Sequence, residues 1–582
     1  MPITEKLSRD SLSTDYGSSR VRVGVVLDSP AVPRWIQQIL VQLDRATCAE
    51  LVLIVNINRC EESAEPPSAR EMPVLFDLWR RLDRRVFQAR SMHSDTFDLS
   101  TFTAECSHPQ ILDCRLRDSN KYFNLQESDL QTIKRADLDV LVDLSGSVCR
   151  RQLQECIRYG VWFFEETDDL LISLYGDFVH HTLTRESGVK VQLGGRDIGT
   201  VPCACSAIDP LSLFRTYSNL CSKRSTMLLQ ALNELNSCGW RHIHDSLIRR
   251  DTAPVTKPSN LGTANLGTRL LLRAATQQVR ARFFHEQWFV AFKAKHVPDK
   301  FAGEGSLTIL HPPHDRFYAD PFVIDRGDKS YIFFEDFSYR KNKAVISFVE
   351  IDASGRCSTP ELVLEEACHL SYPFLLKWEG EIYLIPETKT IRTVQLYRAT
   401  QFPRGWQLVK VLLSDVAAVD STVFHHHGKF WLFTSGIGTA DPWFNGHSEL
   451  FLFYSNSLLG PFTPHPRNPV VSDVRRSRAA GQIFWSNGQL IRPAQDYSVT
   501  DSFAVTLNLI DTLSEREYHE TAVATLPPTW MKGNIGTHTF NRSERYEVID
   551  GRTLAGPMSR RRSRPTLQTV RLTQPLIHDL AP

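Results

Sequence analysis

The sequence predicts a multidomain protein in which an α/β domain with a doubly wound sheet is followed by an all-β, five-bladed β-propeller. Three observations predict this architecture. The chain has 582 residues, which is too long for a single hydrophobic core. Apolar runs alternate with helical spacing in the first half, and one hairpin pattern recurs in the second half.

The composition excludes several classes of partner. The 67 basic and 66 acidic residues nearly cancel, so no binding to nucleic acid is expected. The first twenty residues hold no apolar core, and no run approaches the ~20 apolar residues of a membrane span. The 12 cysteines are scattered without a CxxC pair, which favours reduced thiols over disulfides or a zinc site. These features predict a cytoplasmic protein without a membrane span.

The first half shows the strand–helix alternation of an α/β domain over residues 20–250. Its strands are continuous apolar runs, as in a parallel sheet covered on both faces. Residues 1–19 lack such a pattern and are expected to be disordered. A stretch rich in Thr, Pro, Asn and Gly, followed by a basic helical stretch, predicts a linker and helix over residues 251–285. The predicted strands are Val21–Leu27, Leu51–Ile57, Leu138–Gly146 and Gly160–Phe164.

The second half repeats one pattern: an apolar strand, a turn, and a second apolar strand that ends on a polar residue. The copies start at Asp320, Tyr372, Asp420, Ala480 and Thr537, so the starts are 52, 48, 60 and 57 residues apart. The polar residues fifteen positions after the first four starts are Glu335, Glu387, Ser435 and Gln495.

A repeat of roughly fifty residues with room for four strands is typical of a propeller blade, so five copies predict five blades over residues 286–555. We expect the early strand Gln287–Ala294 to complete the last blade and close the ring. Residues 556–582 are expected to form a flexible tail.

The propeller geometry predicts where the polar positions gather. The first strand of each blade lines the central channel, and its start lies at the same end as the end of the antiparallel second strand. Carboxylates crowded at one mouth of the channel separate in pKa, so that one serves as an acid while another stays a base. Such a mouth suits a sugar. The predicted catalytic residues are Asp320, Asp420, Glu387 and Glu335, and the predicted ligand-binding residues are Tyr372, Arg492, Gln495, Asp496 and His538. His425–His427 are expected in a turn at the opposite face, and no metal site is predicted.

The segments "YADPF", "GEIYLIPET", "LFYSNSLLGPFTPHPRNPV" and "GTHTFN" resemble a five-bladed propeller domain. This domain occurs at the N-terminus of plant glucosamine inositolphosphorylceramide transferases and in bacterial glycan-biosynthesis proteins. The resemblance covers about residues 286–555.

The same segments are similar to the propellers of arabinanase and xylosidase-type glycoside hydrolases. That resemblance implies a general base at Asp320 and a pKa-tuning carboxylate at Asp420. The usual motif of the acid is absent, so Glu387 or Glu335 would have to replace it. His538 could correspond to a histidine that helps to hold a central ion in the arabinanase type.

The first half resembles the formyltransferase fold that uses formyl-tetrahydrofolate. Asp197 and Gly199 match its closing Asp-x-Gly loop. The family's Asn-x-His pair is replaced by residues 163–165, and an ionised Glu165 cannot stabilise an oxyanion as an amide and a neutral imidazole do. We therefore predict a degenerate scaffold that does not use formyl-tetrahydrofolate.

These observations predict a cytoplasmic, bacterial-type protein of glycan biosynthesis whose propeller binds and transfers a nucleotide-linked or lipid-linked sugar unit. Three alternatives stay open. The first is an inverting glycoside hydrolase, which needs two carboxylates about 6.5–9.5 Å apart. The second is a glycan-binding scaffold without catalysis. The third is an active sugar N-formyltransferase.

Overall fold

The computed structural model describes residues 20–572 with gaps. The gaps are residues 30 and 166 and the ranges 59–71, 89–95, 100–108, 116–124, 146–152, 154–155, 250–255, 296–305, 437–447, 500–502 and 557–562. The predicted disorder of residues 1–19 and the first residues of the predicted linker lie outside the described residues.

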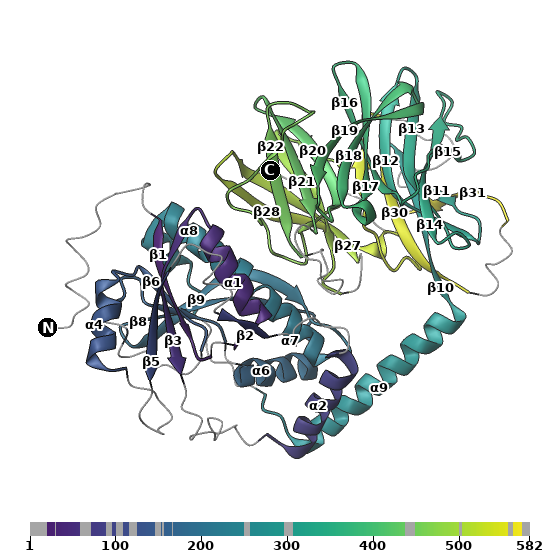
Figure 1. The fold of residues 1–582 in the computed structure, drawn as a ribbon. Coiled ribbons are helices and arrows are strands. Elements are labelled where there is room, and N and C mark those ends of the chain that lie inside the picture. Colours follow the sequence, from purple (N-terminus) through teal and green to yellow (C-terminus); the bar gives the residue numbers. More distant parts are fainter. Residues whose placement is uncertain are drawn as a thin grey trace. The chain divides into compact units, whose positions relative to one another are not determined.

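Residue contacts divide the chain into two units (Figure 1). The first comprises residues 1–181, 186–204 and 212–266, and the second comprises residues 182–185, 205–211 and 267–582. Each unit is described by itself below.

The first unit is built on a seven-stranded sheet with the order β5-β3-β1-β6-β7-β8-β9. The pairs β1–β3, β1–β6, β3–β5 and β6–β7 are parallel, and β8 runs antiparallel to β7. The predicted α/β sheet is therefore confirmed. Its strands are β1 (Val21–Leu27), β3 (Ala49–Asn58), β5 (Gln110–Arg115), β6 (Val140–Asp143), β7 (Val161–Phe163), β8 (Thr184–Leu193) and β9 (Arg196–Ala207).

Hydrophobic cores cover both faces of this sheet because its central strands are apolar throughout. Val23 and Val25 of β1 pack into one core with α1 and α8 residues, whereas Val26 belongs to a second core that includes Ile133 of α4. Helix α1 buries Ile36, Ile39, Leu40 and Leu43 at helical spacing. The longer helices are α1 (Arg34–Arg45), α2 (Val74–Gln88), α4 (Glu127–Arg135), α6 (Thr167–His180), α7 (Leu213–Ser222), α8 (Arg224–Ser246) and α9 (Asn260–Phe283). A bilayer crossing would need a longer apolar run than any helix in the described ranges provides.

The second unit is a propeller of five sheets, which confirms the predicted blade number. Blade 1 contains β12 (Arg316–Arg326), β13 (Lys329–Ser338), β14 (Lys343–Ile351) and β15 (Glu361–Leu364). Blade 2 contains β16 (Ser371–Trp378), β17 (Glu381–Thr388), β18 (Thr393–Gln401) and β19 (Arg404–Ser414). Blade 3 contains β20 (Val419–His426), β21 (Lys429–Ser435), β22 (Leu450–Ser455) and β23 (Thr463–Pro464). Blade 4 contains β24 (Arg478–Ala479), β25 (Phe484–Ser486), β26 (Gln489–Asp496), β27 (Ala504–Leu513) and β28 (Tyr518–Leu526).

Blade 5 closes the ring by joining the two ends of the repeat region. Strand β30 (Tyr546–Ala555) pairs antiparallel with β10 (His285–Ala294) over its whole length. Strand β10 contains the segment Gln287–Ala294, which was predicted to complete the last blade. Beside them lie β29 (Phe540–Arg542), β11 (Ser306–His311) and β31 (Thr566–Arg571).

Strand β31 corrects the prediction of a flexible tail for residues 566–571, whereas residues 557–562 and 573–582 of that predicted tail lie outside the described residues. Residues 566–571 pair antiparallel with β11 and add a fifth strand to the last blade. The segment "TLQTVR" is short and only weakly apolar, so its pattern alone does not indicate a strand. The partner that stabilises it, β11, lies more than 250 residues earlier in the chain.

The first strands of three blades carry the same irregularity at the start of the repeat. The pairing register slips between Ala319 and Phe322 in β12, and equivalent slips occur in β16 and β20. Asp320, Tyr372 and Asp420 lie in these bulges with left-handed φ angles of 52°, 44° and 50°. A bulge re-aims the side chain of the inserted residue, which explains why the repeat directs one residue of each of these blades to an equivalent place.

Candidate functional site

The structure brings the four predicted carboxylates together at one end of the hairpins. Ala319, next to Asp320, pairs with Glu335, and Ser371 pairs with Glu387. Burial raises the pKa of Asp320 to about 7, and the charges of Asp420 and Glu335 add to this increase. These carboxylates therefore lie within electrostatic reach of one another. We call Asp320, Glu335, Glu387, Asp420, Arg478, His538 and Asp550 the axial cluster.

Asp320 links three blades through its carboxylate. One oxygen accepts the backbone N–H of Tyr372 in blade 2 (3.1 Å), and the other accepts the hydroxyl of Thr539 near blade 5 (2.7 Å). The backbone N–H of Asp320 donates to Asp550 (3.2 Å). Asp320 thus holds the ring together in addition to contributing charge to the cluster.

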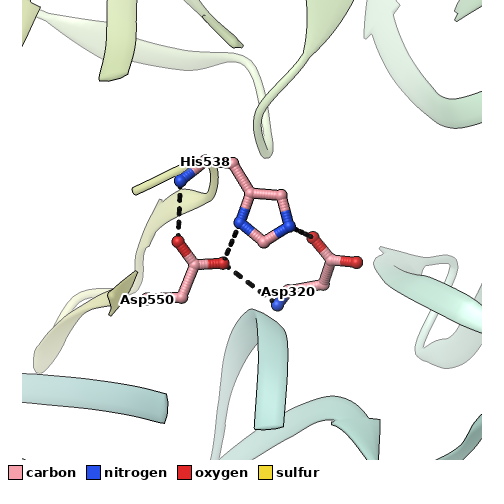
Figure 2. Close-up of side chains that lie close together, drawn as sticks. All are labelled: Asp320, His538 and Asp550. Carbon is pink, nitrogen blue, oxygen red and sulfur yellow. Dashed lines mark hydrogen bonds and ion pairs between the residues drawn. The ribbon is translucent and has the colours of Figure 1, made fainter. Parts of the chain in front are cut away.

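His538 lies between two carboxylates (Figure 2). Its Nδ1 is 2.5 Å from an oxygen of Asp550, and its Nε2 is 3.3 Å from an oxygen of Asp320. The ring also packs against Trp288, with 4.1 Å between the ring centroids. Burial opposes the charge on His538, but Asp550 and Asp320 outweigh it and raise the pKa of the imidazole to about 9. The side chain is therefore an imidazolium at neutral pH.

Asp320, His538 and Asp550 could hold a metal ion, because their ligand atoms lie within 4.8 Å of one another. The donor set does not fit one. Two ligands of one ion each stand about 2 Å from the metal and lie farther apart than the 2.5 Å between His538 and Asp550. Asp550 Oδ1 already accepts the backbone N–H groups of His538 and Thr539 at 2.8 and 3.0 Å. These contacts describe a protonated imidazole between two carboxylates. The correspondence of His538 to an ion-binding histidine finds no support in this geometry.

The other side of the axial cluster is organised by Arg478, which the sequence analysis did not identify. Its Nε is 2.5 Å from Asp420 Oδ2, and its Nη2 is 4.0 Å from Glu387 Oε2. Gln495 donates to the same Asp420 oxygen at 2.7 Å. Tyr497 receives a hydrogen bond from Arg478 Nη1 at 2.8 Å. Asp420 is therefore fixed by two donors and positions the guanidinium beside Glu387.

Glu387 is the carboxyl group best suited to give up a proton. Burial and the charge of Asp420 raise the pKa of Glu387 well above its usual range, which favours the protonated carboxyl group. Side-chain exposures are 12% for Glu387, 16% for Arg478 and 11% for His538, but only 1% for Asp420. A ligand at this end can touch Glu387, Arg478 and His538, whereas Asp420 acts through Arg478.

Two predicted ligand-binding residues have their polar groups bound inside the protein. Tyr372 is fully buried, and its hydroxyl contacts Thr422 at 2.8 Å and receives the N–H of Gly481 at 2.8 Å. The guanidinium of Arg492 is 1% exposed and pairs with Glu520 at 2.6 Å. The prediction that these two side chains contact a ligand is wrong, because each satisfies a buried partner. The same prediction is wrong for Gln495, which is fully buried and donates to Asp420 and to the backbone oxygen of Ala479, both at 2.7 Å.

The remaining predicted residues keep local roles in the structure. Asp496 ends β26 and accepts the N–H of Ser498 at 2.8 Å. His369, which the sequence analysis missed, lies 3.3 Å from Glu335. His425 and His426 end β20, and His427 follows with a left-handed φ of 49° in the turn.

The residues of the predicted remnant in the first unit make the following contacts. Asp197 accepts the N–H of Gly199 at 3.1 Å in β9, and the backbone oxygen of Glu165 accepts from Arg224 at 2.9 Å. These contacts describe a turn and a helix contact. The resemblance to the formyltransferase fold stays a prediction.

The pKa shifts of His538 and Asp320 predict that the stability of the folded propeller depends on pH. The pKa of His538 is raised to about 9 in the folded state, so its stabilisation is full below the unfolded value of about 6.5 and is lost as the pH rises toward 9. The pKa of Asp320 is also raised, to about 7, so its ionisation lowers the stability between its unfolded value of about 3.9 and about pH 7, mostly below the range of His538. We expect the melting temperature to fall between pH 6.5 and 9, and to fall less in His538→Gln. His519→Gln, at an exposed imidazole, is the control, and equal slopes in all three proteins would contradict the prediction.

Comparison with known proteins identifies relatives of the propeller. Residues 310–556 match the family model described as "Glucosamine inositolphosphorylceramide transferase 1, N-terminal". The chain is 36% identical over 242 residues to glucosamine inositolphosphorylceramide transferase 1 of Oryza sativa subsp. japonica. It is 37% identical over 239 residues to the protein of that name from Arabidopsis thaliana. These alignments cover 41% and 40% of this chain, but only 32% and 30% of the relatives. This chain thus spans about a third of the length of the curated relatives that it matches.

Several solved structures that align with this chain are glycoside hydrolases. One is Zg3597, a family 117 glycoside hydrolase of Zobellia galactanivorans, with 15% identity, a TM-score of 0.30, and coverage of 46% of this chain and 90% of that one. Another is the catalytic domain of a GH62 α-L-arabinofuranosidase of Coprinopsis cinerea, with 13% identity, a TM-score of 0.33, and coverage of 44% and 90%.

The curated relatives are plant proteins, which conflicts with the expectation of a bacterial protein, and the cytoplasmic location stays a prediction. The family match begins at residue 310 and so does not bear on the first unit. Residues 310–556 are therefore similar to the N-terminal domain of glucosamine inositolphosphorylceramide transferases, as the motifs of the second half predicted.

Proposed function

We propose that the propeller binds a sugar unit at the axial cluster and takes part in its transfer during glycan or glycolipid biosynthesis. The observation that carries this proposal is the pairing of Glu387, whose pKa is raised, with the cationic Arg478 at 4.0 Å, in a cluster that also contains the cationic His538. The relatives are named glucosamine inositolphosphorylceramide transferase 1. They support the same class of reaction for this chain.

The arrangement can supply the proton transfers of glycosyl exchange. Moving a sugar between two oxygens requires an acid for the leaving oxygen and a base for the attacking hydroxyl. Glu387 can serve as the acid because its pKa is held well above the usual value. Asp320, with a pKa of about 7, can take up a proton near neutrality. Arg478 and His538 would bind the phosphate or hydroxyl oxygens of a nucleotide-linked or lipid-linked sugar.

One observation favours a second function, a glycan-binding module without catalysis. Both oxygens of Asp320 already accept protein donors, and its side chain is only 6% exposed. In that case Asp320 is structural, and the ligand is held by Glu387, Arg478 and His538 alone.

Glu387→Gln separates the two functions. The amide keeps the hydrogen bonds of a protonated carboxyl group but cannot donate its proton, so transfer should fall at least about 100-fold while ligand affinity stays within about threefold. Purified full-length protein is screened with nucleotide sugars and glycolipids by thermal shift, because a bound ligand stabilises the folded state. Transfer and release of free sugar are then measured on the ligands found.

Glu381→Gln is the matched control, because Glu381 is an exposed residue at the other end of the same strand. Unchanged transfer by Glu387→Gln would contradict the acid role. Binding without transfer in the wild type would support the binding module, and release of free sugar would support a hydrolase. A wild type that binds none of these ligands would overturn the proposal.

A further inference from the structure

A second polar cavity lies in the propeller, on blade 1, outside the axial cluster. Its volume is about 520 Å³, within the range of about 300–1,000 Å³ that small-molecule sites occupy. Arg316, Tyr318 and Asp336 line its floor, and Arg564 and Pro565 of the segment before β31 line another side. We call it the tail pocket, because the C-terminal strand helps to form it.

The floor of the tail pocket is one face of blade 1, opposite to the face that carries Glu335. Tyr318 pairs with Asp336, and Asp336 pairs with Val345, so these side chains share one side of the sheet. Glu335 is the neighbour of Asp336 in the chain, and successive side chains of a strand point to opposite faces. The tail pocket and the axial cluster are therefore back to back at the same end of blade 1.

The lining carries a surplus of positive charge. Four basic residues, Arg316, Lys341, Lys343 and Arg564, stand against two acidic ones, Asp336 and Glu365, which leaves two positive charges unbalanced. Lys343 is 3.1 Å and Lys341 is 3.6 Å from the same oxygen of Glu365, so one carboxylate serves two ammonium groups.

Two of these cations retain free donors. Arg316 uses only Nη1 to bind Asp336, at 2.9 Å to each oxygen, which leaves Nε and Nη2 without a hydrogen bond to the described residues. Arg564 is exposed, and within the described ranges it forms no hydrogen bond or ion pair with another side chain. The hydroxyl of Tyr318 stays protonated as a further donor, because burial and the charge of Asp336 raise its pKa.

We propose that the tail pocket binds the phosphate group of a phosphate ester through Arg564, Lys341 and the free edge of Arg316. Guanidinium and ammonium groups are the side chains that bind phosphate oxygens most strongly. Pro313, Pro360 and Leu362 provide apolar walls against which the body of the ligand packs. The inference rests on the proposed function only for the source of the ligand, a phosphate-bearing donor or acceptor of the transferred sugar.

The test is a charge reversal in the full-length protein. The double variant Arg564→Glu with Lys341→Glu changes two exposed residues of the pocket and should weaken binding of glucose 1-phosphate and inositol 1-phosphate at least about tenfold by calorimetry. The control is Arg340→Glu with Lys410→Glu, two exposed residues outside the lining that give the same net charge. The control should bind both esters within about twofold of the wild type.

Two kinds of vesicle identify the source of the phosphate. Co-sedimentation with phosphatidylinositol vesicles, but not with phosphatidylcholine vesicles, and its loss in the pocket variant would assign the pocket to a lipid headgroup. Binding of the free esters without co-sedimentation would assign it to a soluble phosphate ester. No binding to the wild type, or equal binding by both double variants, would overturn the proposal.

This result is independent of the test of the axial cluster. Glu387→Gln should leave binding of the phosphate esters in the tail pocket unchanged, because Glu387 does not line the pocket. A variant that loses sugar transfer should therefore still bind the phosphate esters, so the two tests can be told apart.

Discussion

Replacing Asp550 by alanine should lower the free energy of unfolding of the propeller by at least about 3 kcal/mol. The carboxylate is fully buried. It accepts the backbone N–H groups of His538 (2.8 Å), Thr539 (3.0 Å) and Asp320 (3.2 Å). Alanine would leave three buried donors unsatisfied and would remove one of the two carboxylates beside the His538 imidazolium.

The loss should be measured by urea unfolding of the full-length protein, followed through the transition of the propeller. Asp550→Asn keeps an acceptor oxygen, so it should lose less stability than alanine. Asp328→Ala, at an exposed turn, is the control and should leave the transition unchanged. A loss below about 1 kcal/mol for Asp550→Ala would show that the N–H groups find other partners.

The second large effect is expected at the ion pair of Arg492 and Glu520. Both side chains are 1% exposed and are joined by two hydrogen bonds of 2.6 and 2.7 Å. Glu520→Ala leaves a buried guanidinium without its carboxylate, which typically costs about 3–5 kcal/mol. Unfolding in urea, compared with the wild type at the same pH, measures this cost.

The double variant Arg492→Met with Glu520→Leu tests the cause. Replacing both partners by apolar residues leaves no unpaired charge, so it should be clearly more stable than Glu520→Ala. If the double variant were as unstable as the single one, lost packing and not the unpaired charge would explain the effect.

The repeat explains why much of the cluster could be predicted. Each blade buries its apolar face against its neighbours, so the chain must return to the axis at the same point of every copy. Asp320 and Asp420 occupy that point, and Glu335 and Glu387 end the paired strands beside it. Sequence spacing alone placed these four carboxylates at one end of the hairpins.

The errors at Arg492 and Tyr372 have specific physical causes. Residues three positions apart in a strand point to opposite faces. Because Gln495 reaches Asp420, Arg492 must face the other way, where Glu520 stands. Tyr372 occupies the repeat position of the two aspartates, but its ring is apolar and packs edge-on against Phe322 at 4.8 Å, so it fills the interior.

The amino-acid order by itself determined the α/β sheet, the number of blades, the strand that closes the ring and the end of the blades that carries the acids. These follow from local periodicity, which neighbouring residues fix. Only the tertiary structure decided which partners these acids have. Arg478 reaches Asp420 from 58 residues away, and Asp550 accepts the N–H of Asp320 from 230 residues away. The first pair forms when blades 3 and 4 pack together and the second when blades 1 and 5 close the ring, and no pattern within one blade contains either distance.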